Sequence, residues 1–297
     1  MPTDSPVRVA VDCRCQLGEG PVWHPERGTL LWVDIYDQVV CEADGTGGAW
    51  RTIGFGEPVS ALGLIDASSV AVASAAGLYR LNLDTGERAL FAPLEADKPG
   101  NRSNDGRVGP GGAFWIGTMA DRPTAEGKGA VYRYHAGAFD VVRPNVTTPN
   151  SIAFSPDGTR AYFSDTGEHR IWLYALDPAT GAPRGKPELF VDLSGEGLLP
   201  DGSVVDSAGR LWNAQFGSGR VACYRPDGTF ERAIDFPVAQ TTCPAFGGSD
   251  FKTLFVTSAS VGLDAEQRQT QPLAGAVFAV ELDVAGQPER RLKLGVS

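Results

Sequence analysis

Acidic and amide side chains recur in this sequence at the starts of predicted strands that lie far apart in the chain. Glu19, Asn150 and Asp201 occupy such positions, and Asn104 and Asp105 occupy another. Carboxylate and amide oxygens are hard ligands, so Glu19, Asn150 and Asp201 could bind one divalent cation and leave positions open for water and substrate. Ca²⁺, Zn²⁺, Mn²⁺, Mg²⁺ and Fe²⁺ all accept such ligands, so the identity of the metal stays open. A site of this kind indicates catalysis or ligand binding.

A turn is the alternative interpretation of these residues, because Asp-Gly and Asn-Gly pairs usually mark turns. Asp201-Gly202 and residues 104–106 precede the first strand of a predicted repeat, however. By contrast, the pairs at Asp157 and Asp227 fall between strands. The matching places of the first group favour a shared site.

A weak internal repeat supplies the elements that must position these side chains. Short apolar strands recur about 45 residues apart, at 31–34, 70–73, 114–117, 161–164, 211–214 and 254–257. Each has a strand and a turn before it and two further strands after it. Six repeats of four strands predict an all-β, six-bladed β-propeller that spans residues 1–297 as one domain. A β-sandwich is the alternative, but it does not explain the period.

The propeller would bring the polar residues together. The first strand of each blade lines the central channel, so the starts of these strands meet at one mouth. The strand at residues 7–11 should pair into the last blade beside residues 290–294 and close the ring. The long loops at 120–128 and 259–273 should reach over the mouth, and the recurring tryptophans Trp32, Trp115, Trp172 and Trp212 should pack between blades.

Composition excludes several classes of function. The net charge is −10, so nucleic acid is not an expected partner. No apolar stretch reaches the roughly 20 residues of a membrane span, and the first residues do not resemble a signal peptide, so we expect a cytoplasmic protein without a membrane partner. Five cysteines, an odd number, are expected to be reduced thiols.

Two rival kinds of hydrolase chemistry lack their residues. His24, His135 and His169 fall outside the predicted mouth, in surface or turn positions, so no histidine pair is available as a base. The sequence has no evident Gly-X-Ser-X-Gly elbow for a serine nucleophile.

Five motifs in order carry a family resemblance along the whole chain. They are LGEGPVW at 17–23, NRSNDGRV at 101–108, WIGTM at 115–119, PNS at 149–151 and PDGSVVD at 200–206. Together they resemble the gluconolactonase and senescence-marker-protein (regucalcin-like) family. The segment PLAGAVF at 272–278 is most similar to bacterial xylonolactonases of that group.

The resemblance implies a metal-dependent sugar lactonase that opens a xylono-, arabinono-, galactono- or gluconolactone to the aldonic acid. It implies that Glu19, Asn150 and Asp201 are the ligands of one divalent cation. Asp201 would also be the general base, and Arg102 and Asn104 would contact the sugar lactone. Alternatives are a non-catalytic calcium-binding regulatory protein, a broader lactone or organophosphate esterase, and a propeller that serves only as an interaction platform.

One position departs from the family pattern. Some members place a substrate-binding glutamate shortly after the WIGTM motif, where ungapped counting gives Arg122, with Asp121 just before it. Asp121 is therefore the candidate substrate-binding acid. Arg122 cannot accept hydrogen bonds from sugar hydroxyls, so recognition should favour small neutral lactones. The oligomeric state stays open.

Overall fold

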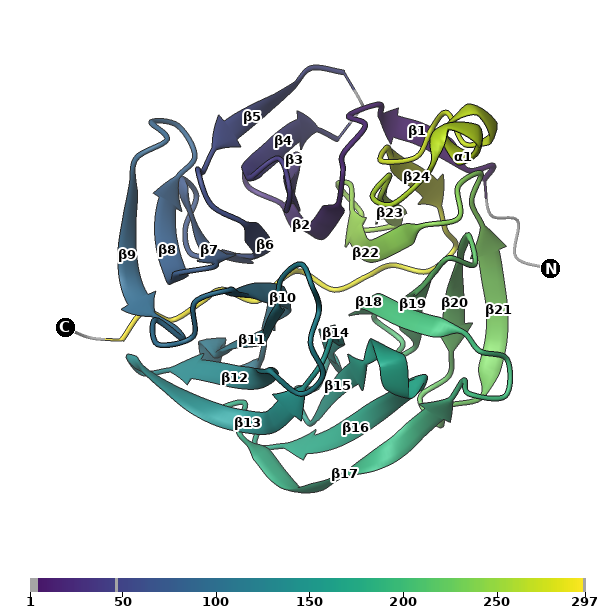
Figure 1. The fold of residues 1–297 in the computed structure, drawn as a ribbon. Coiled ribbons are helices and arrows are strands. Elements are labelled where there is room, and N and C mark those ends of the chain that lie inside the picture. The colour runs from purple at the N-terminus through teal and green to yellow at the C-terminus, as the bar shows by residue number, and fades with distance from the viewer. Residues whose placement is uncertain (1–4, 46–47, 296–297) are drawn as a thin grey trace.

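The strands of the protein form six blades around a central axis (Figure 1). The structure is a computed structural model that describes residues 5–45 and 48–295. The first three blades are β2 (Gly18–His24), β3 (Thr29–Asp34), β4 (Val39–Asp44) and β5 (Trp50–Gly54); β6 (Val59–Leu64), β7 (Ser69–Ser74), β8 (Gly77–Asn82) and β9 (Arg88–Pro93); and β10 (Asn101–Val108), β11 (Phe114–Ala120), β12 (Gly129–His135) and β13 (Ala138–Val146).

The remaining blades repeat this order of strands from the axis outward. They are β14 (Pro149–Phe154), β15 (Arg160–Asp165), β16 (Arg170–Leu176) and β17 (Pro183–Asp192); β18 (Leu199–Val205), β19 (Leu211–Phe216), β20 (Arg220–Tyr224) and β21 (Phe230–Asp235); and β22 (Thr241–Gly247), β23 (Thr253–Ser258), β24 (Val277–Glu281) and β1 (Arg8–Val11). The predicted six-bladed, four-stranded, all-β propeller is confirmed.

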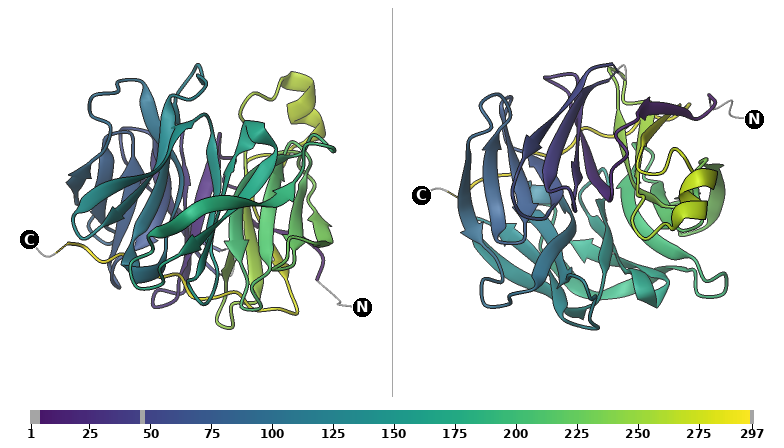
Figure 2. Two further views of the ribbon diagram at one scale, coloured as in Figure 1. Left: turned by 90° about the horizontal axis from the view of Figure 1, so that it is seen from below. Right: turned by 45° about the horizontal axis from the view of Figure 1, so that its top comes forward.

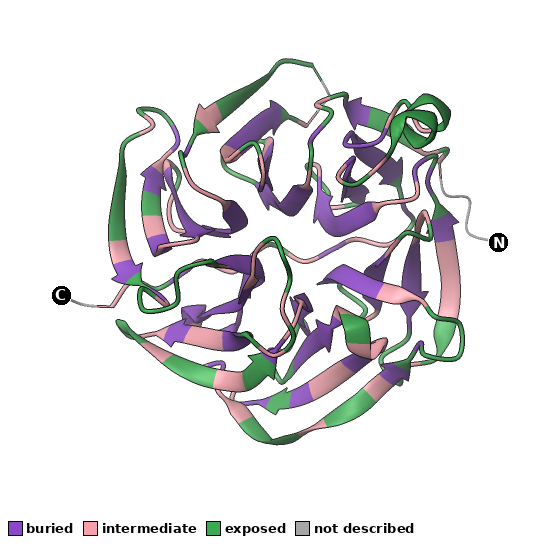
Figure 3. Ribbon diagram, in the orientation of Figure 1, coloured by how far each residue is buried: buried purple, intermediate pink, exposed green. Residues whose placement is uncertain are grey.

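Burial decreases from the axis to the rim (Figure 3). The innermost strands β2, β6 and β14 are buried along their whole length, whereas the outer strand β5 is mostly exposed. Trp32, Trp115 and Trp212 have no exposed surface and pack against residues of a neighbouring blade, as expected. Trp172 is half-buried but also packs between blades, against the apolar cluster shared by the third and fourth blades, and its indole N–H donates to Glu168.

The N-terminal strand closes the ring, as the sequence predicted. β1 pairs antiparallel with β24, with Arg8 opposite Ala279 and Val9 opposite Phe278. The expected place of residues 290–294 beside that strand is wrong. This segment crosses the end of the propeller that lies opposite α1 (Figure 2), where Leu292 N–H donates to Leu64 O at 2.7 Å. The reason is that β1 already occupies the free edge of β24.

Helices are few and short. They are α1 (Ala265–Thr270) and the 3₁₀ turns η1 (Pro110–Gly112) and η2 (Thr166–Glu168). No helix within the described ranges is long and apolar enough to cross a membrane. All five cysteines are free.

Candidate functional site

A β-bulge interrupts the innermost strand of every blade at a corresponding place. The pairing with the second strand shifts between Glu19 and Val22, Val59 and Ala61, Asn104 and Gly106, Asn150 and Ala153, Pro200 and Ser203, and Thr241 and Pro244. A bulge twists the strand and redirects its side chains. The predicted ligands therefore lie at equivalent bulges of three blades.

These bulges decide against the interpretation of the Asp-Gly and Asn-Gly segments as turns. Asp201 and Gly202 lie inside β18, and residues 104–106 lie inside β10. Gly202 is required by close packing, because a Cβ at this position would collide with Cys243 of the next blade. Gly20, at the bulge beside Glu19, has a φ of +53° and approaches the Ser60 carbonyl closely.

Glu19 and Asp201 form a buried pair of carboxyl groups at the channel. They are 5% and 6% exposed, and no ion pair to either is found within the described part of the chain. Burial, followed by the charge of Asp105, raises the pKa of Glu19 to about 8. Burial, followed by the charges of Glu19 and Asp105, also raises the pKa of Asp201 well above its usual range. No ion pair with a described residue offsets this effect, and the charge of Arg102 lowers the pKa of Glu19 less than burial and Asp105 raise it.

Asn150 is connected to this pair through the backbone of the neighbouring blade. Its Nδ2 donates to Thr166 Oγ1 at 2.8 Å, and Thr166 Oγ1 donates to the carbonyl of Pro200, next to Asp201, at 2.9 Å. Among the described residues, no three His, Cys, Asp or Glu side chains form a metal-binding group by themselves. A cation held here by the two carboxylates would need a further donor, and the amide oxygen of Asn150 is a hard oxygen of the kind that suits a divalent cation.

Arg102 and Asn104 lie side by side on β10. Arg102 Nη1 donates to Asn104 Oδ1 at 2.8 Å, and Asn104 Nδ2 donates to Pro149 O at 2.8 Å and to Asn150 Oδ1 at 3.2 Å. Both polar atoms of Asn104 are thus engaged. Asn104 connects Arg102 to the Asn150 side of the candidate cation site.

Asp121 holds Arg102 from the other side. Its Oδ1 accepts a hydrogen bond from Arg102 Nε at 3.1 Å and another from the Tyr36 hydroxyl at 3.3 Å. The guanidinium of Arg122 lies 3.7 Å from the centre of the Tyr36 ring. Tyr36 was not predicted, because it lies 85 residues before Asp121 in a loop without a motif.

Asp105 was seen in the sequence but given no function. Its Oδ1 accepts from Gly106 N–H at 2.7 Å and its Oδ2 from Ile152 N–H at 2.8 Å, so it joins the bulges of adjacent blades. Burial raises its pKa. In the sequence, only its position in the Asn-Asp-Gly segment 104–106 pointed to a role at the site.

The two long loops differ in their position. The loop after β11 reaches the mouth, since Asp121 contacts Arg102 there. The segment 259–273 begins beside the start of β2, where the N–H groups of Ser260 and Val261 donate to Gln16 O, but its helix α1 lies over the outer part of the sixth blade (Figure 1) and does not cover the mouth. Hydrogen bonds fix both ends of this segment: Ser260 Oγ donates to Cys15 O, and Gln271 Oε1 accepts from Ala239 N–H.

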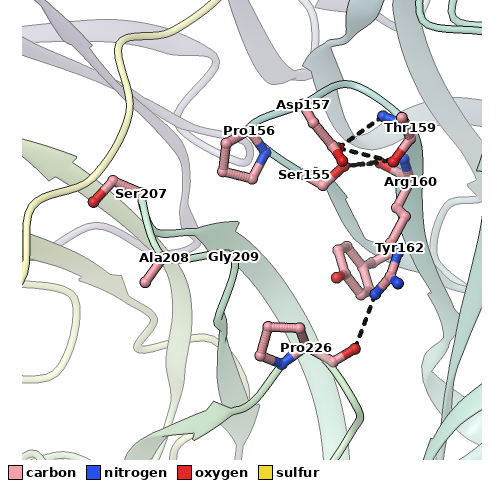
Figure 4. A pocket seen from close by; sticks show the side chains of 10 residues that line it. All are labelled: Ser155, Pro156, Asp157, Thr159, Arg160, Tyr162, Ser207, Ala208, Gly209 and Pro226. Atoms are coloured by element: carbon pink, nitrogen blue, oxygen red, sulfur yellow. Dashed lines mark hydrogen bonds between the residues drawn. The ribbon is translucent and has the colours of Figure 1, made fainter.

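The end of the channel opposite the mouth has a different character. His24, expected at the surface or in a turn, is fully buried at the end of β2, and its Nε2 lies 3.2 Å from Asp66 O. Burial lowers its pKa. A hollow of about 360 Å³ between the fourth and fifth blades is lined by Tyr162, Arg160 and hairpin residues (Figure 4). None of the predicted site residues lines it.

Comparison with known proteins assigns the family. The model of the SMP-30/gluconolactonase/LRE-like region matches residues 17–260, which is most of the chain. The chain belongs to the SMP-30/gluconolactonase/LRE-like family. Within this family it is 38% identical over 276 residues to 6-deoxy-6-sulfogluconolactonase of Pseudomonas putida, covering 92% of this chain and 94% of the relative. It is 34% identical over 286 residues to a pentonolactonase of Haloferax volcanii, covering 95% and 96%.

A solved structure of the same family has nearly the same fold. The calcium-binding protein regucalcin from Agrobacterium tumefaciens superposes with a TM-score of 0.95 at 40% sequence identity, covering 97% of this chain and 98% of that chain. The similarity therefore extends over nearly the whole propeller.

Proposed function

We propose that this protein is a metal-dependent sugar lactonase that hydrolyses an aldonolactone to the aldonic acid. One observation carries the proposal: Glu19 and Asp201 are buried carboxyl groups that form no ion pair with another described residue, and they lie at the same mouth as Asn150 and Arg102. The family includes relatives named as lactonases of sugars, which supports the same reaction class here.

Glu19, Asn150 and Asp201 would hold the cation. A bound divalent cation would polarise the lactone carbonyl and lower the pKa of water beside it. Asp201 would accept the proton of the attacking water, and its burial excludes competing solvent from this proton transfer. Arg102 would orient the substrate: within the described structure its Nη2 makes no hydrogen bond, while Nε and Nη1 are held by Asp121 and Asn104.

Asp121 acts in this proposal as the residue that positions Arg102. One of its oxygens already accepts two hydrogen bonds, and a carboxylate retains further acceptor positions for a sugar hydroxyl. Both amide hydrogens of Asn104 are used by Pro149 O and Asn150 Oδ1, so Asn104 would contact a sugar hydroxyl as an acceptor, through the second lone pair of its Oδ1. The relatives are named for chemically different sugar lactones, so the rim around Arg102 and Asp121 is the place where substrate choice would arise.

Calcium binding without catalysis is the second candidate, favoured by the similarity to the calcium-binding regucalcin structure. Two measurements on metal-free protein separate the lactonase from the regulatory protein. The first is binding in a titration with Ca²⁺, Mn²⁺, Zn²⁺, Mg²⁺ and Fe²⁺, and the second is hydrolysis followed on a pH-stat with each cation. The substrates are xylono-, arabinono-, galactono- and gluconolactone, with simple aryl esters and organophosphates as comparison. We expect cation-dependent hydrolysis of sugar lactones. Binding without turnover would support the regulatory protein, and equal turnover of the esters would support the broader esterase.

A further inference from the structure

The C-terminal segment, residues 282–294, closes the channel at the end opposite the mouth (Figure 2). It makes hydrogen bonds to every blade. The partners are Glu26, Leu64, Gly112, Phe154, Ser207 and Phe251, which belong to the first through the sixth blade in that order. The segment is thus a floor shared by the whole ring.

Glu289 of this segment forms an ion pair with Arg107 of the innermost strand β10. The two side chains are only 12% and 10% exposed. The cavity between them and the surrounding strands measures about 10 Å³, which leaves room for at most about one water molecule. The pair is therefore direct and largely shielded from solvent.

Arg107 joins blades that are not neighbours. Its Nη2 donates to the carbonyl of Ser203 in β18 at 3.2 Å, so its side chain extends from the third blade to the fifth. Ser203 ends the bulge of β18 that begins at Pro200 and contains Asp201. The charge of Arg107 also acts on Asp105, whose carboxylate ties the third blade to the fourth.

Burying this ion pair costs free energy of folding. Apolar side chains could occupy the same space between the C-terminal segment and the strands. The free energy needed to remove two charges from water offsets much of their mutual attraction. Proteins in which such a pair is replaced by apolar residues of similar volume are therefore often as stable as the original. A role in stability alone therefore does not explain the pair well. Its geometry offers a second role, because the guanidinium is fixed at both ends directly below the bulge that aims Asp201.

We propose that Arg107, held by Glu289, is a positioning residue for the candidate cation site. It fixes the backbone of the Asp201 bulge, and through Glu289 the C-terminal segment becomes part of the site although it lies at the other end of the channel. The catalytic part of this inference rests on the proposed lactonase function, but its effect on cation binding does not.

The decisive variant replaces both partners, Arg107→Met with Glu289→Met, so that no buried charge is left alone. The measurements are the Mn²⁺ dissociation constant by calorimetry, the melting temperature without metal, and kcat and KM for gluconolactone. We expect the double variant to keep a melting temperature near that of the wild type. Its Mn²⁺ affinity and its kcat should each fall by about tenfold or more, the usual effect of losing a residue that orients metal ligands, with KM nearly unchanged.

Two single variants and a control complete the test. Arg107→Lys keeps the charge but cannot reach both acceptors, so its Mn²⁺ affinity should lie between those of the wild type and the double variant. Glu289→Gln should lie between the wild type and the double variant. Glu26→Gln removes an exposed ion pair between the first blade and Arg291 of the same segment, and should leave the Mn²⁺ affinity unchanged.

A double variant that binds Mn²⁺ as the wild type does would overturn the proposal, because the pair would then serve stability alone. If the double variant does not fold, the single variants Glu289→Gln and Arg107→Lys take its place. Weaker Mn²⁺ binding by them supports the proposal, and wild-type affinity overturns it. A wild type that binds Mn²⁺ but hydrolyses no lactone would remove the proposed function and leave this inference standing if the variants still weaken binding. A wild type that binds no Mn²⁺ would overturn both.

Discussion

Replacing Glu19 by Gln should stabilise the metal-free protein at alkaline pH. The pKa of Glu19 in the folded protein is raised from 4.5 to about 8, first by burial and then by Asp105. A carboxyl group whose pKa is raised on folding contributes stability below its unfolded pKa, and this contribution is lost as the pH rises through the folded value. Stability of the metal-free wild type should therefore decline between about pH 4.5 and pH 8.

The structure sets the size of this effect. At about 1.4 kcal/mol for each pKa unit, the shift of Glu19 is worth about 5 kcal/mol over the whole window. The raised pKa values of Asp201 and Asp105 act in the same direction. In Glu19→Gln the amide stays neutral at every pH. The free energy of unfolding should therefore fall with pH by several kcal/mol less than in the wild type, as the raised pKa of Glu19 requires.

Urea denaturation of chelator-treated protein at steps between pH 5 and pH 8.5 measures this difference. Glu26→Gln, which removes an exposed carboxylate from the other end of the propeller, is the control and should follow the wild type. Added divalent cation should restore stability to the wild type most strongly at pH 8, and much less to Glu19→Gln. A metal-free wild type with the same stability at pH 5 and pH 8.5, or equal slopes for wild type and Glu19→Gln, would refute the reasoning.

Three further outcomes follow from the geometry. Asp201→Asn keeps a coordinating oxygen but loses the base, so it should retain part of its metal affinity while kcat falls by about a hundredfold or more; full activity with metal bound would show that another group activates water. Tyr36→Phe removes one hydrogen bond to Asp121, so kcat/KM for sugar lactones should fall by about two- to tenfold, and an unchanged value would separate Tyr36 from substrate orientation. Deleting residues 1–12 removes β1 and opens the ring, so the melting temperature should drop, whereas cooperative unfolding at an unchanged midpoint would contradict the closing role of this strand.

The features of the fold that the sequence allowed us to predict follow from the repeat, whereas the family and the expected roles of Arg102 and Asp121 came from the motifs. The period of about 45 residues gives six blades, and the radial arrangement of first strands brings Glu19, Asn150 and Asp201 to one channel without any knowledge of their contacts. The pairing of residues 7–11 was predictable as well, because a ring needs a strand to close it.

The features that sequence reasoning missed depend on contacts outside the repeat. Residues 282–294 bind mainly through backbone groups and carbonyl acceptors at the ends of other strands, which leave no hydrophobic period to detect. Arg107 and Glu289 are 182 residues apart, and either one alone reads as a surface charge. The bulges were also invisible, since a register shift is a property of two paired strands.

The most direct test of the central claim is the anomalous diffraction of Mn²⁺ in a crystal of this protein grown with that ion. The account predicts one strong peak in the channel, within about 2.6 Å of oxygens from Glu19, Asn150 and Asp201 together. A peak bound by other residues, or a channel without any peak at saturating Mn²⁺, would contradict it.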